Sequence, residues 1–568
     1  MASYEFFLTS SLEKVFPDSR PKPLRTHLFS GLSNERLAFQ LVYSVSDEIA
    51  LDTQQEFVFS IEGCPVIPRI RSVELIPSHY PATHVRDRNY LRTDPGLFPD
   101  LLVPATGRIR PVANQYKSLW IDLDLEGAKS GSYALTVKVS ADKYLTLVNE
   151  ETKVPSSASR FDWQTALTLE VIDQRLPQQS LLHTEWFHAD CIADYYGEEV
   201  FSEEYWRILE NFMTFAAKES RVNMLLTPIF TPPLDTQIGG ERTTVQLVGI
   251  TRTEGEYSFD FAKLDRWCSI CRKVGITHLE IAHFFTQWGA YATPKIMAIV
   301  DGVETMLFGW HVRATDLEYR TFLTSFVPSL LEALAQAGYE KQHLRFHISD
   351  EPNEAHLDSY LAAKAQVIDL LDGCIVMDAL SSFEFYQKGI VTNPIPSNDH
   401  IQTFVDNKVE HLWVYYCVGQ GKDVPNRFFS MPSARNRIMG VLLYLYAIEG
   451  FLQWGFNFYN SQYSKKHINP YVTTDCGQVF PSGDAFLVYP GDDGEVYSSI
   501  RNEVQVAAFQ DVEAFTLLES LSDRGTVVSM IEEGVGYALS FTHYPWDEEY
   551  LFDLRARVNT KIVELSRT

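Results

Sequence analysis

The chain from about residue 178 onward alternates short apolar segments with longer amphipathic ones. The short segments have strand length and the longer ones have helical spacing, so the pattern predicts repeated strand–helix units. Strands are expected near residues 182–188, 221–228, 277–284, 343–349, 373–379, 389–395, 411–417 and 451–457. Helices are expected near 202–218, 260–274, 317–337, 354–371, 398–407, 431–448 and 497–522. Eight such units over this length predict a (β/α)8 (TIM) barrel.

A doubly wound open sheet is the main alternative for alternating strands and helices. It would require a glycine-rich phosphate turn after the first strand, and the sequence has none there. Nor does it contain a nucleophilic serine elbow, a P-loop or a dinucleotide fingerprint. The barrel is therefore favoured, and no cofactor is expected.

The first 176 residues have a different pattern. Short aromatic and β-branched segments are separated by turns rich in proline and glycine, and residues 133–139 alternate cleanly after Gly131. This predicts an N-terminal antiparallel β-sandwich. A short C-terminal extension is expected to hold a hairpin over 525–541 and a helix over 548–565. The expected domains are 1–176 (sandwich), 177–523 (barrel) and 524–568 (extension).

Charge and composition narrow the class of partner. The 568 residues carry a formal net charge of −26, which disfavours nucleic acid, anionic membrane surfaces and polyanionic substrates. The longest apolar run, 438–448, is far shorter than the roughly 20 residues of a spanning helix. The N-terminus lacks signal-peptide features, and seven scattered cysteines suit a reducing compartment. We expect a cytoplasmic protein with a small neutral substrate; its oligomeric state stays open.

Two adjacent carboxylates, Asp350 and Glu351, follow the strand expected at 343–349. Barrel enzymes carry their catalytic side chains at this end of the strands. An adjacent acid pair is expected where a 2-acetamido sugar supplies its own nucleophile: Asp350 would hold the acetamido group, and Glu351 would be the acid/base. The alternative is that Ser349 to Asn353 only begins a helix, because Ser, Asp, Asn and Pro are favoured there. The local pattern leaves both interpretations open.

Aromatic and polar residues gather at the ends of several predicted strands. A pyranose ring stacks its apolar face on aromatic rings while its hydroxyls need polar partners. Trp413 and Tyr415 share one strand face, and Tyr415 lies nearer the C-terminal end, so Trp413 could instead belong to the core. The candidate substrate-binding residues are His188, Asn223, His283, Asp378, Trp413, Tyr415 and Trp454.

A metal site is the alternative to this carbohydrate site. His188, His283 and His347 could meet in a barrel, but the sequence has no tight pattern such as H-E-x-x-H. Cys268 and Cys271 lie in a helical pattern without a second pair, which indicates core packing. No metal is therefore expected.

Several stretches together resemble glycoside hydrolase family 123, the β-N-acetylgalactosaminidases. They are 186–191 (WFHADC), 281–285 (IAHFF), 348–352 (ISDEP), 412–417 (LWVYYC), 450–454 (GFLQW), 483–490 (GDAFLVYP) and 498–501 (SSIR). The resemblance implies a β-sandwich joined to a barrel and a retaining enzyme that removes terminal β-linked GalNAc, including from glycosphingolipid oligosaccharides. It also implies that Asp350 orients and polarises the acetamido group and that Glu351 is the acid/base.

Two other functions remain open at this point. A hexosaminidase acting on GlcNAc would use the same mechanism, because GlcNAc differs from GalNAc only at the C4 hydroxyl. A sugar-binding protein on a barrel scaffold would bind without turnover, since fold does not fix function. The intact Asp350–Glu351 pair argues against the second.

Overall fold

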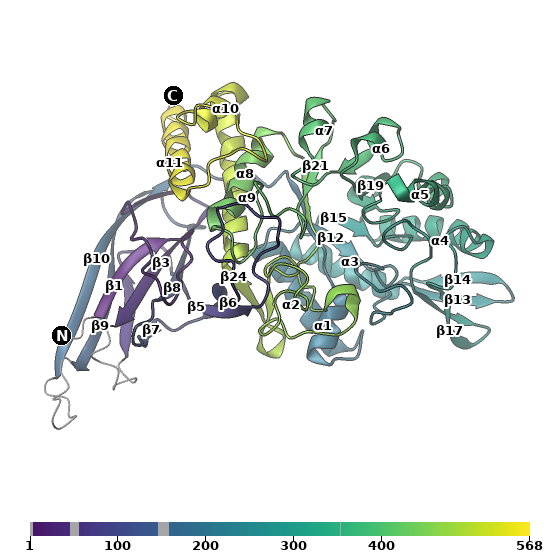
Figure 1. Ribbon diagram of the computed structural model, residues 1–568, viewed down its shortest axis with the longest axis horizontal. Coiled ribbons are helices and arrows are strands. Elements are labelled where there is room, and N and C mark those ends of the chain that lie inside the picture. The colour runs from purple at the N-terminus through teal and green to yellow at the C-terminus, as the bar shows by residue number, and fades with distance from the viewer. Residues whose placement is uncertain (1–3, 46–55, 146–157, 353, 568) are drawn as a thin grey trace.

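The computed structural model describes residues 4–45, 56–145, 158–352 and 354–567 (Figure 1). The predicted barrel is confirmed: one sheet runs in the order β20-β19-β18-β15-β12-β11-β22-β21, with every pair parallel. Backbone bonds from Tyr415 N to Pro396 O (3.0 Å) and from Asn398 N to Tyr415 O (2.9 Å) join its two ends. The strands are β11 (Leu182–Glu185), β12 (Met224–Thr227), β15 (His278–Ile281), β18 (Leu344–Phe346), β19 (Ile375–Ala379), β20 (Asn393–Ile395), β21 (Trp413–Tyr415) and β22 (Gly450–Gln453).

Helices between the strands surround the barrel. In α2, Ser202 accepts a hydrogen bond from Tyr205 N at the start, and Trp206, Leu209 and Met213 repeat at helical spacing on the buried face. The helix expected over 354–371 is shorter than predicted, because 3₁₀ turns flank α5. The helices are α1 (Ala189–Tyr196), α2 (Glu203–Glu219), α3 (Ala262–Val274), α4 (Leu317–Gln336), α5 (Leu357–Lys364), α6 (Phe383–Gln387), α7 (Gln402–Asp406), α8 (Ser433–Leu445) and α9 (Ile500–Leu521).

The N-terminal region forms the predicted two-sheet β-sandwich. All its strand pairs are antiparallel except β2 with β10, and Phe39, Ile121, Val137 and Leu169 belong to its buried core. One sheet contains β1 (Tyr4–Ser10), β3 (Arg36–Val45), β8 (Lys117–Asp124), β5 (Arg69–Ser78), β6 (Gly96–Pro104), β24 (Val496–Ser499) and β23 (Tyr489–Pro490). The other contains β2 (Leu28–Leu32), β10 (Ala158–Ile172), β9 (Gly131–Leu145), β4 (Phe57–Glu62) and β7 (Arg108–Ile109).

The chain that follows the last barrel strand adds two strands to one sheet of the sandwich. Strands β23 and β24 follow the last barrel strand in the chain, yet β24 pairs with β6 of the sandwich (Figure 1). Beside this junction the buried Arg501 forms an ion pair of 2.8 Å with Asp100, which also accepts a hydrogen bond from the Tyr489 hydroxyl (2.6 Å). The two parts are therefore joined by backbone pairing and a buried ion pair.

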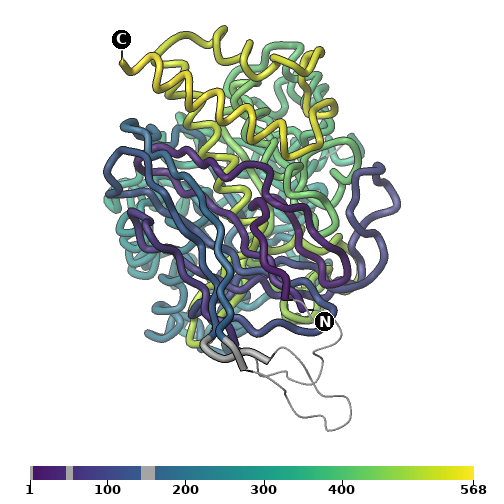
Figure 2. Tube along the Cα trace, turned by 90° about the vertical axis from the view of Figure 1, so that its left-hand side faces the viewer, coloured from purple at the N-terminus to yellow at the C-terminus, as the bar shows by residue number. Residues whose placement is uncertain are grey.

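The C-terminal extension begins with a helix where a hairpin was expected. The prediction for 525–541 is wrong: α10 (Arg524–Glu532) begins after Asp523, whose side chain accepts a hydrogen bond from Thr526 N. Val527 and Ile531 are buried four residues apart, on one helix face. The closing helix is confirmed as α11 (Glu548–Leu565). Figure 2 shows this end of the chain beside the sandwich, where Asn559 Nδ2 donates to Ser30 O (3.1 Å).

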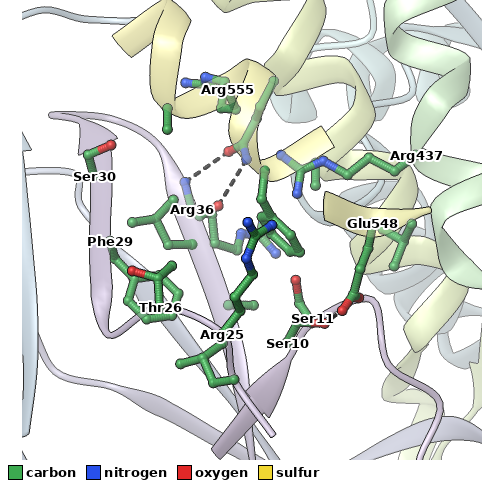
Figure 3. A pocket seen from close by; sticks show the side chains of 18 of the residues that line it. Ser10, Ser11, Arg25, Thr26, Phe29, Ser30, Arg36, Arg437, Glu548 and Arg555 are labelled. Carbon is green, nitrogen blue, oxygen red and sulfur yellow. Dashed lines mark hydrogen bonds between the residues drawn. The ribbon is translucent and has the colours of Figure 1, made fainter. Parts of the chain in front are cut away.

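A cavity of about 240 Å³ lies where the sandwich meets α9 and α11 (Figure 3). The Gln510 side chain bonds both backbone groups of Arg36, at 2.8 and 2.9 Å. Arg437 and Arg555 both bond the buried Asp511. The polar groups at this junction thus pair with one another and tie the two parts together.

Long connections extend from the barrel after β12, β15 and β22. The first two contribute a small sheet ordered β14-β13-β16-β17. All three connections also supply residues to one pocket at the carboxyl ends of the barrel strands. The small-sheet strands are β13 (Gly249–Thr253), β14 (Glu256–Asp260), β16 (Ile296–Val300) and β17 (Val303–Phe308).

Candidate active site

A cavity of about 170 Å³ contains Asp350 and Glu351 among its lining residues. It lies at the carboxyl ends of the barrel strands, where this fold places its chemistry. Aromatic side chains form much of the wall, as expected for a sugar pocket. They are Trp186, Trp288, Tyr415, Trp454, Tyr463 and Phe480.

The two adjacent carboxyls lie directly beyond β18. Both are partly exposed, and both line the cavity. Glu351 has a φ of +43°, a left-handed conformation that a non-glycine residue keeps only where its surroundings hold it. The Tyr415 hydroxyl donates a hydrogen bond of 2.8 Å to Glu351 Oε1. Asn353, included in the predicted helix start, lies outside the described residues.

The surroundings raise the pKa of both carboxyls. Burial raises the pKa of Asp350 well above its ordinary value, and the negative charge of Glu351 raises it further. Burial also raises the pKa of Glu351, although the hydrogen bond from Tyr415 opposes this. Two such close carboxyls titrate as a pair, so they retain one proton over a pH range in which isolated carboxyls have lost theirs. The pair can therefore supply one acid and one base.

A buried histidine lies beneath the pair. His347 Nε2 is 2.7 Å from Glu280 Oε1, and its Nδ1 is 3.5 Å from Asp378 Oδ1. Burial alone would lower the pKa of His347, but these two carboxylates raise it to about 10. His347 is therefore an imidazolium at neutral pH, and its positive charge favours the ionised form of Asp350.

The two carboxylates around His347 also fix neighbouring parts of the pocket. Glu280 accepts a hydrogen bond of 2.8 Å from Trp186 Nε1 on the pocket wall. Asp378 accepts one of 3.0 Å from Ile348 N, and another from the Tyr360 hydroxyl. Asp378 was predicted to bind substrate, but it lies buried beneath the pocket and anchors the strand end that carries the acid pair.

His188 and Trp454, two other predicted site residues, do line the pocket. His188 Nδ1 accepts from Arg242 Nη2 (3.0 Å), and its Nε2–H donates to Trp454 O (2.9 Å). Burial, together with the positive charge of Arg242, lowers the pKa of His188 to about 3, so it is neutral. Trp454 Nε1 donates to Asp484 Oδ2 (3.0 Å), which fixes the indole ring.

Three predicted binding residues lie outside the pocket. Asn223 precedes β12 at the opposite end of the barrel, where it bonds the backbone of His183 and Leu181. Trp413 begins β21 and is only 5% exposed, inside the barrel core. His283 is buried behind the wall, stacked on His347 with ring centroids 4.5 Å apart. The structure corrects the prediction that these three bind substrate. The position of a residue along a predicted strand does not show how deep in the barrel its side chain lies.

The pocket also contains residues that the strand pattern did not indicate. Gln287 and Trp288 come from the connection after β15, and Gln462 and Tyr463 come from the connection after β22. Asp235 comes from the connection after β12. The length of two of these connections was the only signal in the sequence that could have pointed to them.

His347→Gln should destabilise the protein, because it leaves two buried carboxylates without their cation. We expect a loss of about 3–5 kcal/mol in the free energy of unfolding. The raised pKa of His347 means that its contribution is complete below about pH 6.5 and is lost as the pH rises through about 10. Denaturant unfolding at pH 6 and at pH 10 should therefore show a smaller difference between wild type and variant at pH 10.

A matched control is the exposed pair of His411 and Glu449, whose side chains are 72% and 54% exposed. His411→Gln should change stability by less than about 1 kcal/mol at either pH. Equal effects of the two substitutions would contradict the assigned role of His347.

No group of three or more His, Cys, Asp or Glu side chains able to hold a metal ion occurs within residues 4–45, 56–145, 158–352 and 354–567. Cys268 and Cys271 are buried in α3 as unpaired thiols. Over the same described part of the chain, no helix is both long and apolar enough to cross a membrane.

Comparison with known proteins decides the family. Residues 186–518 match the family model for the glycoside hydrolase 123 catalytic domain, and this match spans more than half of the chain. The chain belongs to glycoside hydrolase family 123. It is therefore a glycosidase, and the pocket with Asp350 and Glu351 lies within the matched catalytic domain.

One solved structure supports the fold of this family 123 hydrolase. A family 123 glycoside hydrolase from Clostridium perfringens, described for glycolipid glycan hydrolysis, has 15% identity and a TM-score of 0.72, covering 99% of this chain and 98% of that chain. The catalytic domain of a Pyrococcus furiosus chitinase has 8% identity and a TM-score of 0.29, covering 59% of this chain and 97% of that one. No curated protein sequence matches the chain significantly.

Proposed function

We propose that this family 123 hydrolase removes terminal, non-reducing β-linked N-acetylgalactosamine with retention of configuration. The observation that carries the proposal is the adjacent pair Asp350 and Glu351 in one aromatic-walled pocket, with His347 and its two carboxylate partners beneath it. The sequence motifs resemble β-N-acetylgalactosaminidases, and the Clostridium perfringens relative acts on glycolipid glycans. Both support a terminal GalNAc of an oligosaccharide or glycolipid headgroup as substrate.

In the first step, the carbonyl oxygen of the sugar's own acetamido group attacks C1. A bond forms between that oxygen and C1, the bond from C1 to the glycosidic oxygen breaks, and Glu351 gives its proton to the leaving oxygen. Asp350 accepts the acetamido N–H and stabilises the positive charge of the oxazolinium. The proton of the pair thus belongs on Glu351 once substrate is bound, and His347 favours this distribution by stabilising ionised Asp350.

In the second step, Glu351 is the base. It removes a proton from water, the water oxygen bonds to C1, and the C1–oxygen bond of the oxazolinium breaks to restore the acetamido group. Two displacements at C1 give net retention. No protein side chain forms a bond to the sugar in either step.

The activity is tested by comparing 4-nitrophenyl β-GalNAc with 4-nitrophenyl β-GlcNAc, and by ¹H NMR of the first product formed. We expect faster hydrolysis of the GalNAc glycoside and initial release of the β-anomer. Preference for the GlcNAc glycoside would reassign the substrate to the competing hexosaminidase activity. Initial release of the α-anomer would contradict the mechanism.

A further inference from the structure

Asp235 is a third carboxylate in the active-site pocket, and the two proposed steps do not use it. It lies on the connection after β12 and is half-buried. Other pocket connections fix its backbone: its N–H donates to Gln287 Oε1 (2.5 Å), and its carbonyl accepts from Ser464 Oγ (2.7 Å). Its φ of +38° is left-handed, so this conformation is held by its surroundings. The side chain therefore has a fixed position in the pocket.

Among the described residues, only one oxygen of this carboxylate accepts a hydrogen bond. Oδ2 accepts a hydrogen bond of 2.9 Å from Tyr463 N, whereas Oδ1 accepts none from the described residues. Burial raises the pKa of Asp235 to about 6, against the opposing effects of Tyr463 N and Arg242, so the group is mostly ionised at neutral pH. An ionised carboxylate with a free oxygen in a cavity is a strong acceptor for ligand hydroxyl groups.

Hydrogen bonds connect Asp235 to Asp350, and the negative charge of Asp235 is one of the causes that raise the pKa of Asp350. Gln287, which holds the Asp235 backbone, is followed by Trp288, whose N–H donates to Asp350 O (3.3 Å). In the proposed mechanism Glu351 faces C1 and Asp350 faces the acetamido group on C2. The next positions around the ring on that side are C3 and C4.

We propose that Asp235 binds the C3 and C4 hydroxyls of the terminal sugar and thereby determines which C4 epimer is hydrolysed. The proposal rests on the proposed function, because the acid pair defines where C1 and C2 lie. GalNAc and GlcNAc direct their C4 hydroxyls to different faces of the ring. An acceptor placed for one leaves the other unmatched, and a buried polar group without its partner discriminates strongly.

Asp235→Asn is the informative variant. Its side-chain oxygen can still accept from Tyr463 N, so the contact between connections is kept, while the free acceptor becomes an amide donor. The substrates are 4-nitrophenyl β-GalNAc, its 3-deoxy and 4-deoxy derivatives, and 4-nitrophenyl β-GlcNAc. We expect the substitution to lower kcat/KM on the GalNAc glycoside by about 10²-fold and to reduce the preference for GalNAc over GlcNAc.

The deoxy substrates separate recognition from support of the pocket. For at least one deoxy substrate, the missing hydroxyl should lower the kcat/KM of the wild type nearly as much as Asp235→Asn lowers it on the intact substrate. Combining the variant with that deoxy substrate should then lower kcat/KM by much less than the product of the two separate losses. Ser464→Ala removes only a backbone anchor of Asp235 and keeps the carboxylate, so it should cost less than Asp235→Asn and should keep the preference for GalNAc over GlcNAc. Asp235→Ala, measured with the same substrates, provides a second cycle of variant and missing hydroxyl. Circular dichroism and thermal unfolding show whether each variant is folded.

Two results would overturn the role of Asp235 while leaving the proposed function intact. One is that, with both deoxy substrates, the losses in kcat/KM from the substitution and from the missing hydroxyl simply multiply. The other is an unchanged preference for GalNAc. A wild type inactive on the GalNAc and GlcNAc glycosides would overturn the proposed function, and this inference with it.

Discussion

Glu351→Gln is expected to lower kcat/KM for an unactivated β-GalNAc oligosaccharide by about 10³-fold, because the amide cannot give a proton to the leaving oxygen. The near-equal size of the two side chains should keep the protein folded, and Gln can still accept from the Tyr415 hydroxyl. The loss should be smaller for a 2,4-dinitrophenyl glycoside, whose leaving group needs little protonation. Steady-state kinetics on the two substrates measure this difference.

The matched control is Glu354→Gln, three residues further along the chain. Glu354 is exposed and does not line the pocket, so the same chemical change there should leave both rates unchanged. Near-normal hydrolysis of the oligosaccharide by a folded Glu351→Gln variant would remove Glu351 from the acid/base role.

Asp350→Asn is expected to lower kcat/KM by about 10³-fold for both substrates, including the 2,4-dinitrophenyl glycoside. Attack by the acetamido oxygen is needed whatever the leaving group, and the neutral amide cannot stabilise the positive oxazolinium. The dependence on leaving group therefore distinguishes the two acids. Steady-state kinetics with a series of aryl glycosides of decreasing leaving-group pKa provides the measurement.

Asp358→Asn serves as the control for this substitution, because Asp358 is exposed on α5. It should not change either rate. Recovery of activity by Asp350→Asn as the leaving group improves would mean that Asp350 assists departure of the aglycone, and the assigned roles would have to be exchanged.

The barrel could be predicted because most of its strands are short apolar runs next to helical patterns. The expected strands near 373–379 and 389–395, which have the weakest patterns, are present as β19 and β20. The hairpin over 525–541 was wrong because Thr526, Val527 and Val528 favour strands by composition. Burial of Val527 and Ile531 on one helix face outweighs that propensity.

The site was only partly accessible from the sequence. The structure brings Asp350, Glu351, His188, Tyr415 and Trp454 to one pocket, because strand ends of a parallel barrel meet at one rim. Asn223, His283 and Trp413 lie outside this pocket. The depth of each side chain in the barrel depends on how the barrel packs, which the sequence pattern does not show.

The remaining pocket contacts arise only from tertiary structure. Asp235 bonds Tyr463 N across more than 200 positions of sequence, and no local pattern indicates that such distant connections meet. The network around His347 likewise joins β15, β18 and β19. It is visible only once these strands are placed side by side.

The nucleophile is tested most directly by 4-nitrophenyl β-GalNAc glycosides whose N-acyl group carries zero, one, two or three fluorine atoms. Each fluorine withdraws electrons from the carbonyl oxygen and weakens it as a nucleophile. If that oxygen attacks C1, kcat/KM should fall by about tenfold per fluorine, which corresponds to roughly 1.4 kcal/mol of barrier. A rate that stays nearly constant across the series, together with a glycosyl ester trapped on the protein, would show that a side chain attacks instead.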